Sequence, residues 1–222
     1  MKKTASLIAI ATGFSLMGVA IATAEKISDV TESRSHGDFE RIVIDDAGVG
    51  LDVKIGDSYA VTLNGSEEWA KKITTQVKNN ALVIGYEGKK KKKNFKFDSD
   101  YRITITMPKF TGLDVNGAVD AHISDVDSDD LGFEVNGAAN IEIDGRCGTL
   151  TVELDGAGNF SGEDLKCEAV NVEINGAGNA EVYGSKSATL DINGIGNIDL
   201  YGNPETVKKD KSLFSNITIH NK

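Results

Sequence analysis

Acidic side chains recur in this sequence at a nearly fixed interval, and rows of carboxylates can bind cations or transfer protons. They are Asp114, Glu134, Glu153, Glu173 and Asp191. Each stands three residues before a glycine, where the apolar alternation predicts the outward face of a strand. Such a row offers a diffuse interaction face for a hard cation or a cationic partner. The alternative is a solvated negative face that keeps the protein soluble and prevents association.

A second acidic column follows on the next predicted strand, at Glu142, Glu181 and Asp199, with His122 and Ser161 in the other copies. The pair Glu173 and Glu181, or the pair Asp191 and Asp199, could imitate the two carboxylates of a glycan-cleaving β-helical enzyme. The rows repeat in every copy, however, and the sequence has no G-x-S-x-G or similar nucleophile motif. It therefore predicts a protein without catalytic residues, with a polysaccharide-cleaving enzyme as the alternative.

The stretch EINGAGNAEVYG (173–184) raises the question of a phosphate-binding loop. A dinucleotide fingerprint needs a third glycine and a following helix, but here a strand pattern follows. Glycine also permits positive φ and close backbone approach, whereas asparagine tolerates left-handed geometry and can stack in amide rows. The motif therefore indicates a structural corner, and no cofactor is expected.

Five consecutive lysines interrupt the acidic chain: Lys89, Lys90, Lys91, Lys92 and Lys93. They form either a solvated loop between two strands or a basic contact loop. Its partners would be anionic glycans, lipid headgroups or the acidic face of another copy.

The only two cysteines, Cys147 and Cys167, are 20 residues apart, which is one repeat. Each lies three residues before the first apolar residue of its strand, so the two should stack within disulfide reach. Two cysteines without a nearby histidine do not suit a zinc site, and no metal is expected. The spacing predicts a Cys147–Cys167 bridge between neighbouring repeats.

Five related segments define the fold. Their first glycines are Gly117, Gly137, Gly156, Gly176 and Gly194, with spacings of 20, 19, 20 and 18 residues. Apolar residues alternate before each glycine, which predicts a strand, and a second short strand follows. Repeats of this length bury their apolar face only by stacking in parallel. The sequence predicts an all-β right-handed parallel β-helix, or β-solenoid, with coils of about 19–20 residues.

The expected organisation is one domain over 25–222. Its first half, 36–110, has the same chemistry with looser spacing and should form irregular coils or a sheet that caps the solenoid. Regular coils should span 111–203, and a C-terminal strand at 213–220 should cap the far end.

Residues 1–24 have the pattern of a signal peptide: Lys2 and Lys3, an apolar run, and Ala22-Thr23-Ala24. Cleavage between Ala24 and Glu25 would release a chain without a transmembrane segment. The formal net charge of −10 argues against nucleic acid as a partner. We expect an exported protein, in the periplasm or at the cell surface.

The block DINGIGNIDLYGNP (191–204), its NGAGN relatives and the preceding YRITITMPKFTGLDVNGAVDAHI (101–123) resemble the head GIN domain of putative auto-transporter adhesins. The resemblance covers roughly 37–220. It implies a β-helical, exported cell-envelope protein without an established enzymatic activity. We therefore expect a non-enzymatic adhesin-like binding or structural module, whose partners are envelope glycans or another envelope protein. A glycan-cleaving enzyme and an envelope sensory or scaffolding domain remain the alternatives.

Overall fold

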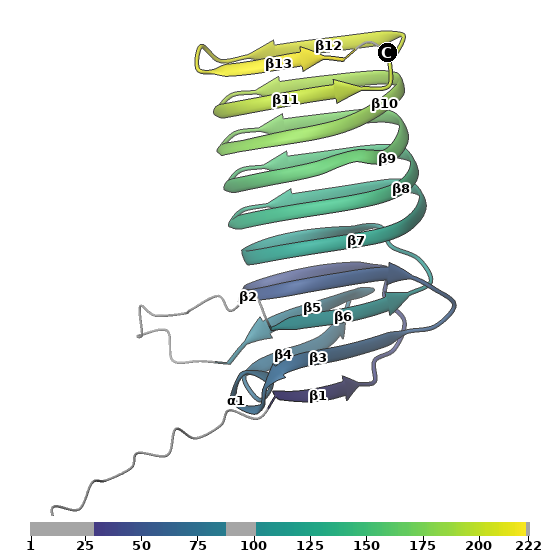
Figure 1. Cartoon of the computed structure of the whole chain (residues 1–222), viewed down its shortest axis with the longest axis vertical. Coiled ribbons are helices and arrows are strands. Elements are labelled where there is room, and N and C mark those ends of the chain that lie inside the picture. The colour runs from purple at the N-terminus through teal and green to yellow at the C-terminus, as the bar shows by residue number, and fades with distance from the viewer. Residues whose placement is uncertain (1–28, 88–100, 221–222) are drawn as a thin grey trace, which may run out of the picture.

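A computed structural model describes residues 29–87 and 101–220, and strands dominate this part of the chain. Thirteen strands form one hydrogen-bonded sheet that winds around a single apolar core, and a four-residue helix interrupts them. Figure 1 shows a stack of flattened coils that rises from the N-terminal to the C-terminal end. The signal peptide expected at 1–24, its expected cleavage point at Ala24 and Glu25, and the lysine run at 89–93 lie outside the described residues.

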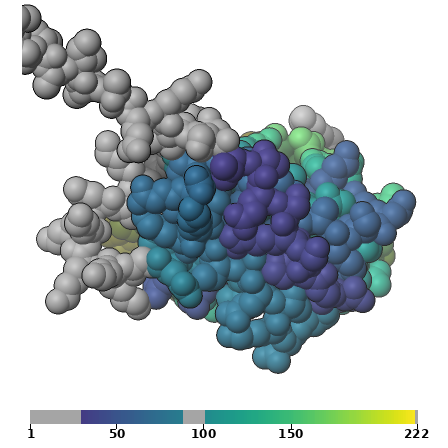
Figure 2. All heavy atoms as spheres, turned by 90° about the horizontal axis from the view of Figure 1, so that it is seen from below, coloured from purple at the N-terminus to yellow at the C-terminus, as the bar shows by residue number. Residues whose placement is uncertain are grey.

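The N-terminal end is an open cap below the first rung of the stack. The cap elements are β1 (Asp29–Arg34), β3 (Ala60–Ser66), α1 (Glu67–Ala70), β4 (Ile73–Lys78), β5 (Ala81–Tyr86) and β6 (Arg102–Met107). The rung itself is β2 (Arg41–Ile55), which pairs in parallel with β5 along its first half and with β6 along its second. Antiparallel partners then extend each branch: β4 beside β5, β3 beside β6, and β1 beside β3. Seen from this end, these segments cover the coils behind them (Figure 2).

Above the cap, each long strand wraps around a coil and pairs in parallel with the next. These strands are β7 (Gly112–Val135), β8 (Ala138–Leu154), β9 (Ala157–Ile174) and β10 (Ala177–Ile192). The shorter β11 (Ile195–Tyr201) pairs in parallel with the first part of β10. Equivalent residues of the repeats lie side by side, as in the row Asn140, Asn159, Asn179 and Asn197. This register confirms the predicted β-solenoid.

Each coil folds into two layers. The first-strand layer holds the residues before each corner glycine, and the second-strand layer holds those after it, with their apolar side chains meeting in the core. Phe133 comes from the first layer and Phe160 from the second; each is at most 2% exposed, and their ring centroids lie 5.0 Å apart. The polar residues between them point outward from one layer or the other. The two layers therefore present opposite outer faces, joined by a tight corner on one edge and a rounded bend on the other (Figure 1).

The corner glycines are required by close stacking. A Cβ on Gly176 would overlap the carbonyl oxygen of Gly156, and a Cβ on Gly194 would overlap that of Gly176. The corner asparagines do not adopt the left-handed geometry suggested by their residue type. Among the described residues, positive φ at non-glycine positions occurs at Asp46, Asn79, Asn80, Asp125 and Asn203, which are all outside the asparagine rows. The asparagines instead serve the coil-to-coil amide bonds described below.

The far end is closed by β12 (Thr206–Lys211) and β13 (Ser215–Ile219), which pair in parallel with β10 and β11. The parallel pairing thus continues beyond residue 203. Lys209 lies beside Leu190 and Lys211 beside Ile192, so lysines take positions that hold buried aliphatic residues in the coil below. The columns of aliphatic core residues therefore end in lysines at this last coil.

Candidate binding surface

The five repeated acids form one column on the first-strand face, as their spacing suggested. Glu134, Glu153 and Glu173 are direct neighbours in the parallel register, and Asp191 follows Glu173. Asp210 of β12 extends the column by one coil, which was not foreseen because the strand pattern there contains lysines.

Part of this column is already engaged within the protein. Arg41 Nε donates to Asp114 Oδ2 at 2.9 Å, and the guanidinium also makes a second ion-pair contact with the same carboxylate. Glu134 and Glu173 each accept a hydrogen bond of 2.9 Å, from Asn136 and Asn175. In the described part of the chain, no group of three or more His, Cys, Asp or Glu side chains is arranged to hold a metal ion. The first-strand face is a negatively charged wall formed by this column.

The opposite, second-strand face carries a groove of about 470 Å³ that runs across the coils. Its lining combines one amide row with one row of ionisable and hydroxyl side chains: Asp120, Asn140, Asn159, Asn179 and Asn197, then His122, Glu142, Ser161, Glu181 and Asp199. Because the coils stack about 4.8 Å apart, the groove repeats the same polar groups along its length.

The amide row is internally ordered. Asn197 donates to Asn179 at 2.8 Å, Asn179 donates to Asn159 at 2.9 Å, and Asn159 donates to Asn140 at 3.0 Å. An amide group has two N–H donors and an oxygen with two lone pairs. The hydrogen bonds between neighbouring asparagines therefore use only part of the hydrogen-bonding capacity of the row. A fixed series of donors and acceptors therefore faces the solvent.

At the N-terminal end of the groove, Arg102 organises the polar side chains. Its guanidinium donates to Asp52 at 2.7 and 2.8 Å and to Asp120 at 3.1 Å. These hydrogen bonds, first that to Asp52, raise the pKa of Arg102 against the opposing effect of burial. Arg102 also lies 2.8 Å from His122 Nδ1, which must accept because arginine can only donate. The Nε2–H of His122 then points toward Glu142, 3.4 Å away.

At the C-terminal end, the same face becomes aromatic. Tyr201 and His220 stack with ring centroids 4.5 Å apart, and His220 Nε2 lies 2.7 Å from Asp199 Oδ1. Tyr183 is the next aromatic residue along the column, and Lys166 Nζ sits 4.4 Å from its ring centre. Lys166, Tyr183, Tyr201 and His220 line a second hollow of about 430 Å³.

The electrostatic setting of this aromatic end is negative. Burial raises the pKa of Tyr201, and the carboxylates of Glu163, Glu181 and Asp199 raise it further. The acidic rows alone did not predict this aromatic column. Its signal in the repeat is that Tyr183 and Tyr201 stand two residues after Glu181 and Asp199.

The carboxylates suggested as an enzyme-like pair do not converge. Glu173 belongs to the column of Glu153 and Asp191 on the first-strand face, whereas Glu181 belongs to the column of Ser161 and Asp199 on the other. The two side chains therefore project from opposite layers of the coil.

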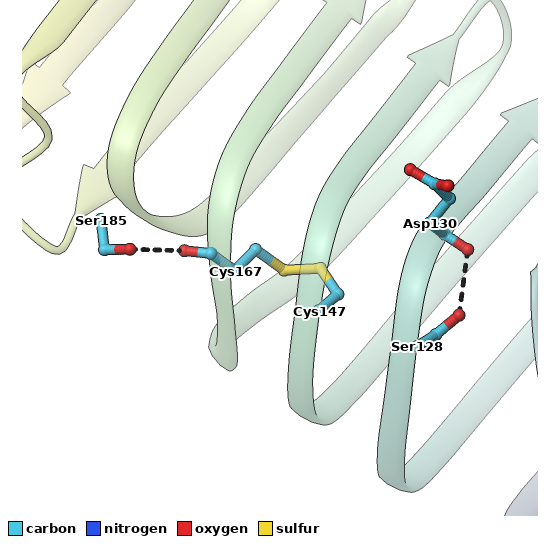
Figure 3. Close-up of a disulfide and its surroundings, with 5 residues drawn as sticks. All are labelled: Ser128, Asp130, Cys147, Cys167 and Ser185. Carbon is cyan, nitrogen blue, oxygen red and sulfur yellow. Dashed lines mark hydrogen bonds between the residues drawn. A yellow bond between two sulfur atoms is a disulfide. The ribbon is translucent and has the colours of Figure 1, made fainter.

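The structure joins Cys147 and Cys167 by a disulfide between neighbouring coils at the rounded bend (Figure 3). The hydroxyl of Ser185 donates to the Cys167 carbonyl at 3.3 Å, which links the bridge to the following coil. No helix in the described ranges 29–87 and 101–220 is long and apolar enough to cross a membrane.

Comparisons with known proteins agree on the fold. A family model described as "Putative auto-transporter adhesin, head GIN domain" matches residues 38–204. A solved structure of a putative adhesin from Bacteroides fragilis NCTC 9343 is similar, with a TM-score of 0.70 and 23% identity, and the match covers 87% of this chain and 97% of that one. A putative adhesin from Parabacteroides merdae ATCC 43184 gives a TM-score of 0.49 and 15% identity over 87% of this chain and 96% of that one. No curated protein matches the sequence.

Proposed function

The chain belongs to the putative auto-transporter adhesin family with the head GIN domain, and from this premise we propose that it is a non-enzymatic binding module of the cell envelope. Its ligands are glycan chains of the envelope, and its contact surface is the second-strand face. The observation that carries this proposal is the groove of about 470 Å³ with its repeated polar rows.

A polysaccharide presents hydroxyl groups at regular intervals, and each hydroxyl can both donate and accept a hydrogen bond. The row Asn140, Asn159, Asn179 and Asn197 offers the matching partners at the coil repeat of about 4.8 Å. Because the amides hold one another in place, little side-chain freedom is lost when a ligand binds. A long chain laid along the solenoid axis would contact several equivalent sites at once.

The aromatic end supports the same ligand class. Tyr183, Tyr201 and His220 supply apolar ring surface and polar tips beside the carboxylates of Glu181 and Asp199. Sugars combine apolar C–H faces with hydroxyls, so they fit a surface of this mixed character. This end would hold a terminal or bent sugar unit, while the amide row holds the extended chain.

Export is part of the proposal. The expected signal peptide at 1–24 directs the chain out of the cytoplasm, and the Cys147–Cys167 disulfide is stable in an oxidising compartment. The carboxylate columns lie on opposite faces and repeat from coil to coil, and no pair of acids differs from its repeats as a catalytic pair would. This arrangement favours binding over cleavage.

An array of envelope polysaccharides, probed with the purified exported protein, tests the proposal. We expect saturable binding that Asn179→Ala and Tyr201→Ala each weaken. The matched control is Asn171→Ala, which removes an exposed amide from the first-strand face of the same coil. Equal binding by all three variants would show that the ligand binds another surface of the protein. New reducing ends or unsaturated products in the same mixtures would replace the binding module with an enzyme.

A further inference from the structure

The turn between β12 and β13 exposes two large apolar side chains. Leu213 is 96% exposed and Phe214 is 79% exposed, and Ile195 in the coil below is 61% exposed. These three are the exposed large hydrophobic residues of the described chain. The turn itself is fixed, because Ser212 Oγ donates to the Gly194 carbonyl at 2.7 Å and Ser215 Oγ donates to the Ser212 carbonyl at 3.0 Å. The apolar tip is therefore presented by an ordered turn.

The tip breaks the repeat at a definite place. Ser212 N bonds to the Ile192 carbonyl as Asn193 N bonds to the Ile174 carbonyl, so Ser212 occupies the corner asparagine position of the last coil. Leu213 then stands in the glycine column, and Phe214 stands in the column of Ala118, Ala138, Ala157, Ala177 and Ile195. Bulky apolar residues replace glycine and alanine where they gain no core contacts. Such a break of a local rule points to a role outside the fold.

The same edge carries a matching hollow at its other end. A depression of about 320 Å³ is lined by Ala118, Val119, Asp120, Ala138, Ala139, Asn140, Ala157 and Gly158. It lies at the first three coils, whereas the tip lies at the sixth, about 14–24 Å away at the coil spacing of about 4.8 Å. The apolar tip and the hollow thus lie on the same edge of the solenoid, which is the left edge in Figure 1.

This edge is almost free of charge. It comprises residues 116–120, 136–140, 155–159, 175–179, 193–197 and 212–216, which are mainly asparagine, glycine and alanine. Asp120 and Asp155 are the only charged residues of these six corners, in a chain with 58 charged residues in total (24 basic and 34 acidic). The exposed Asp45 and Asp46 lie at the β2 corner beside Asn116, below these six. Two acidic molecules can therefore approach each other along this edge without strong repulsion.

We propose that the edge is a self-association surface that joins two copies of the chain as an antiparallel two-fold dimer. With the axis between the third and fourth coils, Phe214 of one copy meets Ala118 of the other. Ile195 meets Ala138, and Ala157 meets Ala177. A large side chain thus faces an alanine at the four outer contacts of the column, alanine faces alanine at the two central contacts, and the two-fold repeats each contact.

The charges of the edge agree with the same arrangement. Asp120 faces Asn216 of the second copy, and Asp155 faces Asn175, so each carboxylate meets an amide and not another acid. The dimer also turns both second-strand faces to the same side of the assembly. A second copy explains both the tip and the hollow, whereas a lipid surface would leave the hollow and the neutral edge without a role.

Sedimentation of the purified exported protein over a concentration series tests the dimer. The double substitution Leu213→Gly and Phe214→Ala restores the residues that the repeat itself uses at these positions, so it should leave the fold intact. We expect the dimer dissociation constant to rise by about 100-fold, because two tips are lost from each dimer. Ala138→Arg, which fills the hollow with a charged side chain at an exposed site, should have a similar effect.

A crosslink tests the geometry. In one chain, Ala118→Cys and Phe214→Cys lie too far apart to react with each other, but in the antiparallel dimer they adjoin. We expect a covalent dimer on non-reducing gels from the double variant and none from either single variant. A protein that stays monomeric to about 1 mM overturns the proposal, as does a dimer that the tip variant leaves unchanged. Binding of the monomer to anionic vesicles through Leu213 and Phe214 would assign the tip to a lipid surface instead.

Discussion

Cys147 and Cys167 occupy the same register position in neighbouring coils, and their Cα atoms lie 4.4 Å apart. The bridge closes a loop of 20 residues, which is one coil. Its main effect is to restrict the unfolded chain, since the two cysteines are already neighbours in the folded sheet.

Removal of the bridge should therefore lower stability without changing the fold. We expect the double variant Cys147→Ala and Cys167→Ala to lose about 3 kcal/mol of unfolding free energy. Urea unfolding of oxidised and variant protein measures the difference. Reductant should lower the midpoint of the original protein and leave that of the variant unchanged; a reductant effect on both would contradict this account.

The corner glycines should be far less tolerant than Gly132, a glycine of the same sheet with room for an added Cβ. Gly176→Ala forces a Cβ into the Gly156 carbonyl, and neither backbone can move without disturbing the stack. We expect a loss of about 3 kcal/mol or more, or failure to fold. Gly132→Ala is the matched control, because its added Cβ meets only the Arg41 side chain at 3.4 Å. Similar unfolding midpoints for the two variants would refute the stacking requirement.

The amide row should contribute measurable stability even though it is exposed. Asn179 both donates to Asn159 and accepts from Asn197, so Asn179→Ala removes two side-chain hydrogen bonds. We expect a loss of about 1 kcal/mol. Asn171→Ala, from the first-strand face of the same coil, should change the free energy of unfolding by less than about 0.5 kcal/mol. Equal effects would mean that the row adds nothing beyond an ordinary exposed amide.

Stability should also depend on pH through His36. Burial, and then the charge of Arg34, hold the pKa of His36 below its ordinary value of 6.5. The unfolded chain therefore takes up this proton at a higher pH than the folded chain. The contribution is complete above about pH 6.5 and is lost as the pH falls toward the lower, folded-state pKa. Between pH 7.5 and 5.5, the urea midpoint should fall less steeply for His36→Gln than for the original protein. An equal slope for the two proteins would show that His36 does not cause the pH dependence.

The lysines of β12 should prevent the coils from stacking end to end. Lys209→Leu together with Lys211→Ile would continue the aliphatic columns of Leu190 and Ile192 to the open end. We expect filaments or aggregates, seen by light scattering and electron microscopy. Lys208 lies beside Thr189 and points outward, so Lys208→Leu serves as the control and should leave the protein dispersed. Dispersed double variants would show that another feature protects this end.

The sequence was most informative where its columns repeat. The alternation around Gly117 to Gly194 predicted the parallel coils, because a residue that recurs at each turn must occupy one row. The cap was less predictable. β1 pairs antiparallel with β3, from Asp29 beside Ser66 to Arg34 beside Val61, and nothing in DVTESR marks that distant partner.

The contact surface was only partly predictable for a related reason. The column of Glu173 was found by its repetition, but a hollow depends on which layer a column faces and what borders it. Arg102 comes from the cap and reaches the groove only through the β2–β6 pairing. His220 reaches Tyr201 only because β13 pairs with β11. β12 was missed because Lys209 and Lys211 interrupt the apolar alternation at the one coil that has no further neighbour to cover it.

The stacking of coils between the cap and β13 also sets how the domain carries mechanical load. Strands run across the long axis of the stack, so the hydrogen bonds between coils lie along it (Figure 1). A force applied between the two ends acts on one row of these hydrogen bonds at a time and separates the outermost coil first. The covalent link between Cys147 and Cys167 prevents that opening from separating their two coils. A tether built in this way lengthens by small steps from its ends, while its middle section stays closed.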